Sequence, residues 1–408
     1  MTSNWMRVIL DGNATPEWLQ EIFPWAEAMA ACPQDSLYHA EGDVWTHTSM
    51  VAAELEASEG FLDLPEPRRD ALRLAAWFHD VAKPRTTEIS WCDVEKRERV
   101  RQPYHAPIGA GMAWQALNDA GCDAALARDV HALVFWHQRP THLLEQKDPL
   151  SRVIRFTAET QETTWSDLLR FCRSDQRGRI SPNVAEGLLD LEVVEEMIRE
   201  ESVNAGADLL EAAWPFASPS ARLRMVRGGK DANPWFTPQE PTGSRMILLS
   251  GLPGSGKDTL ARDAFPGIPM VSLDRIREQM GVSPTDDQGR VRQAGIEAAR
   301  VHLRRGEPFI WNATCVSRST REKIVGIALD YDAKVEAHAL DVPLFVALER
   351  NRKRKEPVPD AVIARIASKR EPLGADEAHE IWSWDAEQRP RQIKGMLKEA
   401  DDPQPDPV

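Results

Sequence analysis

This sequence has few cysteines, no long apolar run and no excess of positive charge. Its five cysteines among 408 residues stand singly, without a Cys-x-x-Cys pair, which argues against a disulfide framework or a cysteine-based zinc site. No apolar stretch approaches the roughly 20 residues that span a bilayer. The opening residues MTSNWMRVIL lack the basic segment and apolar core of a signal peptide. We therefore expect a cytoplasmic protein without membrane contact.

Negative charge prevails, with a formal net charge of −14. Broad electrostatic binding to nucleic acid is thereby disfavoured, because basic surfaces supply most of that affinity, although a local basic groove stays open. A chain of 408 residues is expected to hold two or three domains. Among its fourteen tryptophans, Trp45, Trp77 and Trp136 lie beside apolar residues in helical patterns, which predicts packing roles.

Two kinds of pattern divide the chain. In residues 1–217, apolar residues recur at helical spacing, as in DALRLAAWFHDVAK, which predicts an all-helical domain. Residues 218–243 are rich in Gly, Pro and Ser and predict a linker. In residues 244–408, short apolar runs such as MILLSG and PFIWNAT alternate with amphipathic helices. That alternation predicts an α/β domain with a parallel sheet flanked by helices.

The stretch GLPGSGKDT fits the phosphate-binding pattern G-x-x-x-x-G-K. Its glycines let backbone N–H groups close around phosphate oxygens, and the following helix presents its positive end to them. Lys257 is placed to reach the outer phosphates of ATP, with Mg²⁺ as the expected ion. The residues expected to contact ATP or magnesium here are Gly251, Pro253, Gly254, Ser255, Gly256, Lys257, Asp258 and Thr259.

Asp258 occupies the position where Ser or Thr ordinarily follows the lysine of this loop. An unscreened carboxylate would repel phosphates, but Mg²⁺ favours carboxylate oxygen, so we interpret Asp258 as a magnesium ligand, with Thr259 as a fallback hydroxyl. In the later strand segment IWNAT, Asn312 stands where many P-loop enzymes keep a magnesium-holding Asp. The alternative is a loop that binds nucleotide weakly and catalyses nothing.

Asp274 ends the apolar run PMVSLD, and ligands gather outside the carboxyl ends of parallel strands. A carboxylate there could accept the proton of an attacking hydroxyl, with Arg277 one helical turn later beside the same acceptor. The alternative is that Asp274 caps the helix RIREQM. A basic cluster follows a later strand and consists of Arg350, Arg352, Lys353, Arg354 and Lys355. It is either a lid over nucleotide phosphates or a solvated helix face.

The loop GLPGSGK, the strand end LDRIR and the cluster RNRKR resemble the 5′-polynucleotide kinases of phage type, over about residues 245–370. The resemblance implies transfer of phosphate from ATP to a 5′-OH end of RNA or DNA. The residues it implies are Lys257 on the ATP phosphates, Asp274 as general base, Arg277 at the acceptor end, and Arg350 and Arg354 as lid arginines. Arg318 and Arg321 are weaker candidates.

Histidine and aspartate recur in the first half, in VWTHTSMV, LAAWFHDVAKP, YHAPIGAGMA, LVFWHQRP and FCRSDQRGR. His79 and Asp80 are adjacent on an expected helix, about 100° apart, so that both can reach one ion. Lys83 follows one turn later, placed to meet a phosphate oxygen. Nitrogen and carboxylate ligands together favour a divalent transition metal such as Mn²⁺, Ni²⁺, Co²⁺ or Zn²⁺ over calcium.

The order of these residues resembles the HD phosphohydrolase superfamily, and most closely the HD domain attached to some bacterial CCA-adding enzymes. The implied ligands of a first metal are His47, His79, Asp80 and Asp175. His105 and His137 are implied as ligands of a second metal, or as phosphate contacts of a mononuclear site. His131 points to a different helix face and is left out, and His39 is a candidate phosphate contact.

Together the two halves resemble the bacterial HD-type polynucleotide kinases, which are bifunctional enzymes that heal nucleic-acid ends. The resemblance implies addition of a 5′-phosphate by one site and removal of a 2′-phosphate, 3′-phosphate or 2′,3′-cyclic phosphate by the other, for RNA repair. A nucleic-acid ligase is a candidate partner. Two alternatives stay open. One is an HD nucleotide or phosphate-ester hydrolase fused to a small-metabolite kinase, and the other is an ATP-gated phosphohydrolase.

Overall fold

The structure is a computed structural model that describes residues 4–228, 232–282 and 289–393. The chain divides into two compact units. The first comprises Met1–Trp214 with Pro343–Phe345, and the second comprises Pro215–Val342 with Val346–Val408. Among the described helices, none combines the length and the apolar character that crossing a membrane requires.

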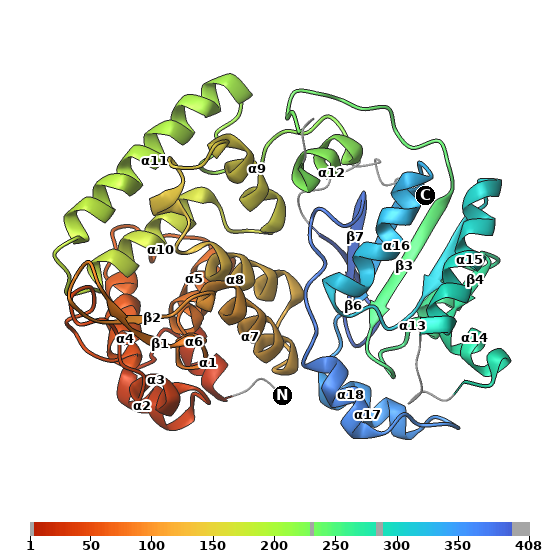
Figure 1. Ribbon diagram of the computed structural model, residues 1–408, viewed down its shortest axis with the longest axis horizontal. Helices are drawn as coiled ribbons and strands as arrows, with labels where there is room; N and C mark the ends of the chain where they lie inside the picture. Colours follow the sequence, from red (N-terminus) through yellow and green to blue (C-terminus); the bar gives the residue numbers. More distant parts are fainter. Residues whose placement is uncertain (1–3, 229–231, 283–288, 394–408) are drawn as a thin grey trace, which may run out of the picture. The chain divides into compact units, whose positions relative to one another are not determined.

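The first unit is built mainly of helices (Figure 1). Its elements in chain order are α1 (Asn4–Leu10), α2 (Pro16–Ile22), α3 (Ala26–Ala30), α4 (Val44–Glu56), α5 (Glu66–Phe78), α6 (Lys83–Thr86), β1 (Glu88–Cys92), β2 (Arg97–Arg101), α7 (His105–Asp119), α8 (Ala124–Trp136), the 3-10 turn η1 (Pro140–His142), α9 (Pro149–Glu159), α10 (Trp165–Arg177) and α11 (Val184–Ala205). The antiparallel hairpin β1–β2 departs from the all-helical prediction. Each strand has only five residues, with β1 largely exposed and β2 partly buried, so the hairpin leaves little periodic signal in the sequence.

Several chemically important side chains of this unit lie where helices begin or end. α5 ends just before His79, α8 ends just before His137, and α7 begins at His105. The Asp43 carboxylate caps α4 and so fixes the start of the helix that carries His47. The helix ends therefore determine where these imidazoles stand.

Aromatic packing fills the interior between these helices. The rings of Trp45 and Trp77 lie 5.2 Å apart, and those of Trp136 and Trp165 lie 6.4 Å apart. All four side chains are buried. The packing role predicted for Trp45, Trp77 and Trp136 is confirmed.

The second unit is an α/β domain with a six-stranded sheet in the order β4-β5-β3-β6-β7-β8. Its elements are α12 (Pro219–Arg227), β3 (Arg245–Gly251), α13 (Lys257–Ala264), β4 (Met270–Ser272), α14 (Leu273–Met280), α15 (Gly289–Arg305), β5 (Phe309–Asn312), α16 (Arg318–Asp330), β6 (Lys334–Leu340), α17 (Leu344–Arg352), α18 (Asp360–Ala367), β7 (Glu380–Trp384) and β8 (Pro390–Gln392). β4, β5, β3, β6 and β7 run parallel, and β8 pairs antiparallel with β7. The predicted parallel sheet flanked by helices is confirmed.

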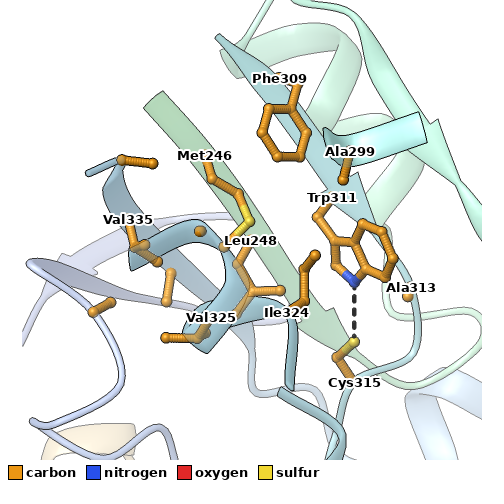
Figure 2. Close-up of a cluster of buried hydrophobic side chains, with 14 of the residues drawn as sticks. Met246, Leu248, Ala299, Phe309, Trp311, Ala313, Cys315, Ile324, Val325 and Val335 are labelled. Carbon is orange, nitrogen blue, oxygen red and sulfur yellow. Dashed lines mark hydrogen bonds between the residues drawn. The ribbon is translucent and has the colours of Figure 1, made fainter. Parts of the chain in front are cut away.

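Strand β3 is buried on both faces, as the alternation of its side chains requires. Met246 and Leu248 pack with α15, α16 and the Trp311 side chain of β5 on one face (Figure 2). Ile247 and Leu249 pack against α13 on the other. Because β3 is central in the sheet and covered on both sides, it holds the loop that follows it firmly at the carboxyl edge.

The segment 218–243, which the sequence predicts to be a linker, is partly helical. It contains α12, and the Arg222 side chain of this helix is only 1% exposed. Its guanidinium donates to the carbonyl oxygens of Ala378 at 2.7 Å and His379 at 2.9 Å. α12 is therefore a packed part of the second unit, which Gly, Pro and Ser content alone could not indicate.

Candidate functional site

Six His and Asp side chains of the first unit converge into two neighbouring groups. One group consists of His47, His79 and Asp175, and the other consists of Asp80, His105 and His137. Within each group the ligand atoms lie within 4.8 Å of one another, and all six residues are buried. The residues proposed as metal ligands from the sequence are thus brought together from α4, α7, α10 and the ends of α5 and α8.

Each of the four histidines is oriented by a backbone carbonyl. The Nδ1 atoms of His47, His79, His105 and His137 face the carbonyl oxygens of Gly178, Ala76, Gln102 and Val134 at 3.1, 2.8, 2.7 and 2.7 Å. Because a carbonyl only accepts, these contacts favour the tautomer with the proton on Nδ1, in which a bound metal ion would meet the Nε2 lone pairs. Burial also lowers the pKa of His137 to about 3, which keeps that ring in the neutral form that binds metal.

The Asp80 carboxylate faces both groups. Its Oδ2 lies 3.2 Å from His79 Nε2 and 3.6 Å from His47 Nε2. Its Oδ1 lies 3.3 Å from His105 Nε2 and 4.0 Å from His137 Nε2. One carboxylate oxygen is therefore directed to each group, so that Asp80 lies within reach of both sets of candidate ligands.

The donor atoms of this cluster fit a divalent ion. Nε2 of His79 and Oδ1 of Asp80 are buried and make no well-aligned hydrogen bond with any part of the chain that the structure describes, while Oδ2 of Asp80 is paired with a cation. Leaving a buried polar atom unsatisfied costs roughly 1–3 kcal/mol. A metal ion would satisfy the first two atoms, and nitrogen with carboxylate oxygen suits first-row transition metals.

Two positively charged side chains pair with the carboxylates of the cluster. The Lys83 ammonium lies 2.7 Å from Asp80 Oδ2, and the Arg179 guanidinium pairs with Asp175. Burial disfavours the charged forms, but His79 and Lys83 hold the pKa of Asp80 well below its usual range. Arg179 does the same for the pKa of Asp175 against its burial. Both carboxylates are consequently available as anionic ligands.

His39 lies at the edge of the cluster. Its Nδ1 is 2.8 Å from Glu41 Oε1, and the same oxygen lies 3.1 Å from His47 Nδ1. Its role as a phosphate contact stays a prediction. His131 stacks on the Phe135 ring and belongs to neither ligand group.

Sequence reasoning missed three polar residues of this site. Glu41 supports His47, Gln34 accepts from Lys83 at 2.6 Å, and Arg179 pairs with Asp175. The i, i+4 spacing could have indicated Arg179, and the position of Glu41 two residues after His39 was a weaker sign. Gln34 left no signal in the sequence, because 49 residues separate it from Lys83.

In the second unit, β3, the Gly-rich loop and α13 form the strand–loop–helix arrangement that phosphate binding needs. Gly254 and Gly256 have φ angles of +82° and +105°, in the left-handed region that favours glycine. A Cβ on Gly254 would also stand 2.3 Å from the Ala347 carbonyl oxygen. Both the backbone conformation and the close approach therefore require glycine at position 254.

The Lys257 ammonium donates to two carbonyls of its own loop at 2.8 and 2.9 Å. Desolvation lowers its pKa to about 8, while the charges of Asp258 and Asp274 raise this pKa and that of Arg354 lowers it. These four side chains therefore interact electrostatically at one site. Phosphate oxygens of a nucleotide would compete with the loop carbonyls for the ammonium.

Asp258 and Asn312, the two departures from the usual P-loop pattern, are in direct contact. Asn312 Nδ2 donates to Asp258 Oδ1 at 2.6 Å. Asn312 is 5% exposed at the end of β5, whereas Asp258 is exposed in the first turn of α13. The expected hydroxyl of Thr259 lies in the same turn and is partly buried.

Asp274 is the second residue of α14, and Ser272 caps that helix by accepting from Arg275 N at 3.4 Å. The alternative that Asp274 is the cap is therefore wrong. Its side chain is 68% exposed and pairs with Arg277 one turn later. The carboxylate is thus open to an incoming acceptor group.

The basic cluster 350–355 is partly engaged within its own unit. Arg350 donates to the carbonyl oxygen of Ser255 in the phosphate loop at 3.4 Å, and Arg352 and Lys353 form ion pairs at 2.6 and 2.7 Å. The exposed Arg354 guanidinium has no ion pair with the residues that the structure describes. Arg350 therefore contacts the phosphate loop, whereas Arg354 is exposed, and the lid role of both arginines stays a prediction.

The weaker candidates Arg318 and Arg321 have other partners. Arg321 is fully buried and donates to both oxygens of Glu377 at 2.8 and 2.9 Å. Arg318 pairs with Asp376. Arg321 is thus buried in an ion pair away from solvent, whereas the Arg318 side chain is 45% exposed and its role at the acceptor stays a prediction.

Two family models match this chain. The model of the HD domain matches residues 44–158, and the model of an AAA domain matches residues 246–373. The chain therefore carries an HD domain followed by a P-loop kinase-like domain, as the motifs predict. The first implies a divalent metal, and the second implies ATP and Mg²⁺. Asp175 lies beyond the matched residues, and only the fold brings it to the cluster.

Parts of this chain also match solved structures. They are a gluconokinase from Sinorhizobium meliloti 1021 (21% identity over 37% of this chain and 86% of that chain, TM-score 0.27), the Pnkp1/Rnl/Hen1 RNA repair complex (19% identity, 43% and 53%, TM-score 0.30) and the tunicamycin resistance protein of Deinococcus radiodurans (20% identity, 31% and 79%, TM-score 0.25). At these TM-scores the likenesses carry no argument about function. No match was found among the curated proteins.

Proposed function

We propose that this chain heals nucleic-acid ends for RNA repair. The P-loop domain would phosphorylate 5′-OH ends with ATP, and the HD domain would remove a terminal 2′-phosphate, 3′-phosphate or 2′,3′-cyclic phosphate. One observation carries the proposal. The chain combines six buried His and Asp side chains that could hold a metal ion with a phosphate loop whose Lys257 interacts electrostatically with an exposed carboxylate, Asp274. Two opposite phosphate reactions in one chain fit the two ends that breakage of RNA leaves.

In the kinase reaction, the 5′ oxygen attacks the γ-phosphorus of ATP. The bond from that phosphorus to the β,γ-bridging oxygen breaks, ADP leaves, and the Asp274 carboxylate takes the hydroxyl proton. Lys257 contacts the phosphates, while Arg277 and Arg354 place positive charge beside the transferring group. The exposure of Asp274 supports this assignment, since an acceptor can reach it.

In the phosphohydrolase reaction, water attacks the terminal phosphorus, and the bond to the sugar oxygen breaks. That oxygen takes up a proton and becomes the free hydroxyl. A 2′,3′-cyclic phosphate needs two such hydrolyses, one for each of its ester bonds to the sugar. A divalent ion, when bound, supplies the Lewis acidity that activates water and stabilises charge on the phosphate. His47, His79, Asp175, His105 and His137 would hold it, with Asp80 shared between the two groups. Lys83 and Arg179 keep the carboxylates anionic.

A second candidate is an HD phosphate-ester hydrolase fused to a kinase of small metabolites. Two observations favour it. The net charge is −14, and three cations of the basic cluster are already engaged within the protein. Both features reduce the positive charge available for a long polyanionic acceptor.

The deciding experiment offers the full-length protein several substrates in parallel. One set pairs γ-labelled ATP with 5′-OH RNA and DNA oligonucleotides, and with nucleosides and sugars as small acceptors. The other set offers oligonucleotides that end in 2′-phosphate, 3′-phosphate or 2′,3′-cyclic phosphate, with Mn²⁺, Ni²⁺, Co²⁺, Zn²⁺ or Mg²⁺. End healing predicts labelled 5′ ends and trimmed 3′ ends.

The other outcomes separate the alternatives. Labelled small acceptors without labelled oligonucleotides would select the metabolite kinase. Phosphate release that depends on ATP, without any labelled acceptor, would select the ATP-gated phosphohydrolase. If no oligonucleotide is labelled or trimmed with any of the five metals, end healing is wrong.

A further inference from the structure

We propose that Asp258 and Asn312 form an exchanged magnesium-binding pair that makes the P-loop select metal-bound nucleotide over free nucleotide. The usual P-loop has Ser or Thr after its lysine and an Asp at the end of the neighbouring strand. Here α13 supplies the carboxylate, and β5 supplies the neutral side chain. The inference rests only on nucleotide binding by the P-loop, and the identity of the phosphate acceptor does not enter it.

The fold places the two residues side by side. β5 pairs with β3 and β4, so that Asn312 stands in register with Leu249 and Ser272 at the carboxyl edge of the sheet. Asp258 follows the loop that leaves this edge. The resulting contact of 2.6 Å joins residues 54 positions apart. A carboxylate only accepts hydrogen bonds, so the Asn312 amide must present its N–H group to it.

This contact uses one oxygen of Asp258 and leaves the other available. Within the part of the chain that the structure describes, Oδ2 has no hydrogen-bond or ion-pair partner. Mg²⁺ is a hard ion that takes one or two carboxylates together with phosphate oxygens and water. An oriented carboxylate with one free oxygen in the first turn after the phosphate loop therefore fits this ion.

Asp258 and Asn312 depart from the usual P-loop pattern in complementary ways. An aspartate at position 312 beside Asp258 would place two carboxylates within hydrogen-bond distance, where like charges destabilise each other. A serine at position 258 beside Asn312 would leave the pair without a carboxylate. The serine is therefore expected to remove the preference for metal-bound nucleotide, and the second carboxylate is expected to weaken binding of free nucleotide. Changing both restores one carboxylate and one neutral partner.

A carboxylate at position 258 also changes which form of the nucleotide the loop binds. Without an ion, the Asp258 charge repels the outer phosphates, against the attraction of the loop amides and Lys257. With Mg²⁺ the repulsion becomes coordination. A hydroxyl at the same position would not discriminate in this way, because it carries no charge.

The test measures binding of a non-hydrolysable ATP analogue to the full-length protein, with Mg²⁺ and with EDTA. We expect wild-type affinity to fall by about tenfold or more in EDTA, the scale of one hydrogen bond to a charged group. The magnesium effect is the ratio of the affinity with Mg²⁺ to the affinity in EDTA. D258S should bind the metal-free analogue more tightly than wild type and lose most of the magnesium effect. N312D should weaken binding in EDTA by about tenfold, on the same scale. D258S/N312D should return the magnesium effect to within about threefold of wild type, less than one such hydrogen bond.

Two results would overturn the proposal. One is a wild-type affinity for the analogue that is the same with Mg²⁺ and with EDTA. The other is a double variant in which the change of the magnesium effect equals the product of the changes in the two single variants, because the two residues would then act independently. D263N is the matched control, because it removes the same charge from an exposed site on α13. If N312D does not fold, the isosteric D258N carries the test. It should bind the metal-free analogue more tightly than wild type, and unchanged or weaker binding would contradict the pairing.

These outcomes do not depend on the acceptor. A protein that shows the coupling but labels no oligonucleotide would retain the magnesium pair and lose the polynucleotide-kinase assignment. A protein that labels 5′ ends without any coupling would retain the kinase and lose the pair.

Discussion

The HD cluster and the P-loop site differ most in burial. The six HD ligands are between 0 and 4% exposed, whereas the Asp274 side chain is 68% exposed and Asp258 is exposed as well. The HD cluster is therefore a buried group of candidate metal ligands whose positions the fold already fixes. The P-loop groups can remain hydrated until nucleotide arrives with its ion. One chain thus combines a prearranged site with one that its substrate completes.

Asp80→Asn should have the largest effect, because this residue faces both ligand groups. We expect no detectable phosphate release and loss of bound metal, since even an outer contact is worth about 10- to 100-fold in metal affinity. Kinase activity should be unchanged. Metal content by mass spectrometry and phosphate release measure the outcome, and Asp63→Asn, at an exposed site of the same unit, is the control. Retained metal with normal release would show that the cluster is not the active site.

Asp274→Asn tests the exposed site. Removing a general base should lower 5′-end phosphorylation by about 10²- to 10⁴-fold, because the attacking hydroxyl loses its proton acceptor. Affinity for the ATP analogue should change little, since Asp274 acts on the acceptor. Ser272→Ala, which removes the real cap of α14, is the control for helix stability. A loss of activity below about tenfold would be too small for this role.

Glu41→Gln tests how far the buried site depends on its outer contacts. Glu41 lies 3.1 Å from Nδ1 of His47, so the isosteric amide should weaken metal binding by about 10- to 100-fold without removing a ligand. Competition with a chelator measures the affinity. Glu17→Gln on the exposed face of α2 is the control. An unchanged affinity for the metal would mean that Glu41 does not contribute to metal binding.

His338→Gln should have the smallest effect and concerns stability. His338 is a buried histidine of the P-loop unit that accepts from Trp384 Nε1 at 3.0 Å, and burial lowers its pKa to about 3. A folded pKa below the unfolded value of about 6.5 means that the unfolded chain takes up the proton first. The stability contribution is therefore complete above about pH 6.5 and is lost as pH falls toward 3.

Between pH 7 and pH 5 this single group should cost about 2 kcal/mol of unfolding free energy. Glutamine keeps an acceptor for Trp384 and does not titrate, so the variant should lose less stability over the same interval. Thermal unfolding of wild type and variant at the two pH values gives the difference. An identical pH dependence would mean that His338 is not buried in its neutral form.

The parts that the sequence predicted are those encoded locally. The motif GLPGSGK predicts a turn with left-handed glycines between a strand and a helix. The structure has φ angles of +82° and +105° at Gly254 and Gly256. The series of histidines and aspartates likewise named the six buried residues that the fold brings together, and their role as metal ligands stays a prediction. Helix α12 and the β1–β2 hairpin were missed, because a Gly- and Pro-rich composition and strands of five residues carry little periodic signal.

Residue types and their spacing along the chain thus determined the two domain classes, the phosphate loop and the ligand set. Only the tertiary structure decided which side chains meet. Asn312 reaches Asp258 across 54 residues, and His47 reaches Asp175 across 128. It also decided that Ser272 caps α14 and that Asp274 stays exposed. The physical reason is that local sequence restricts dihedral angles within a turn, whereas contacts between distant residues depend on how whole helices and strands pack.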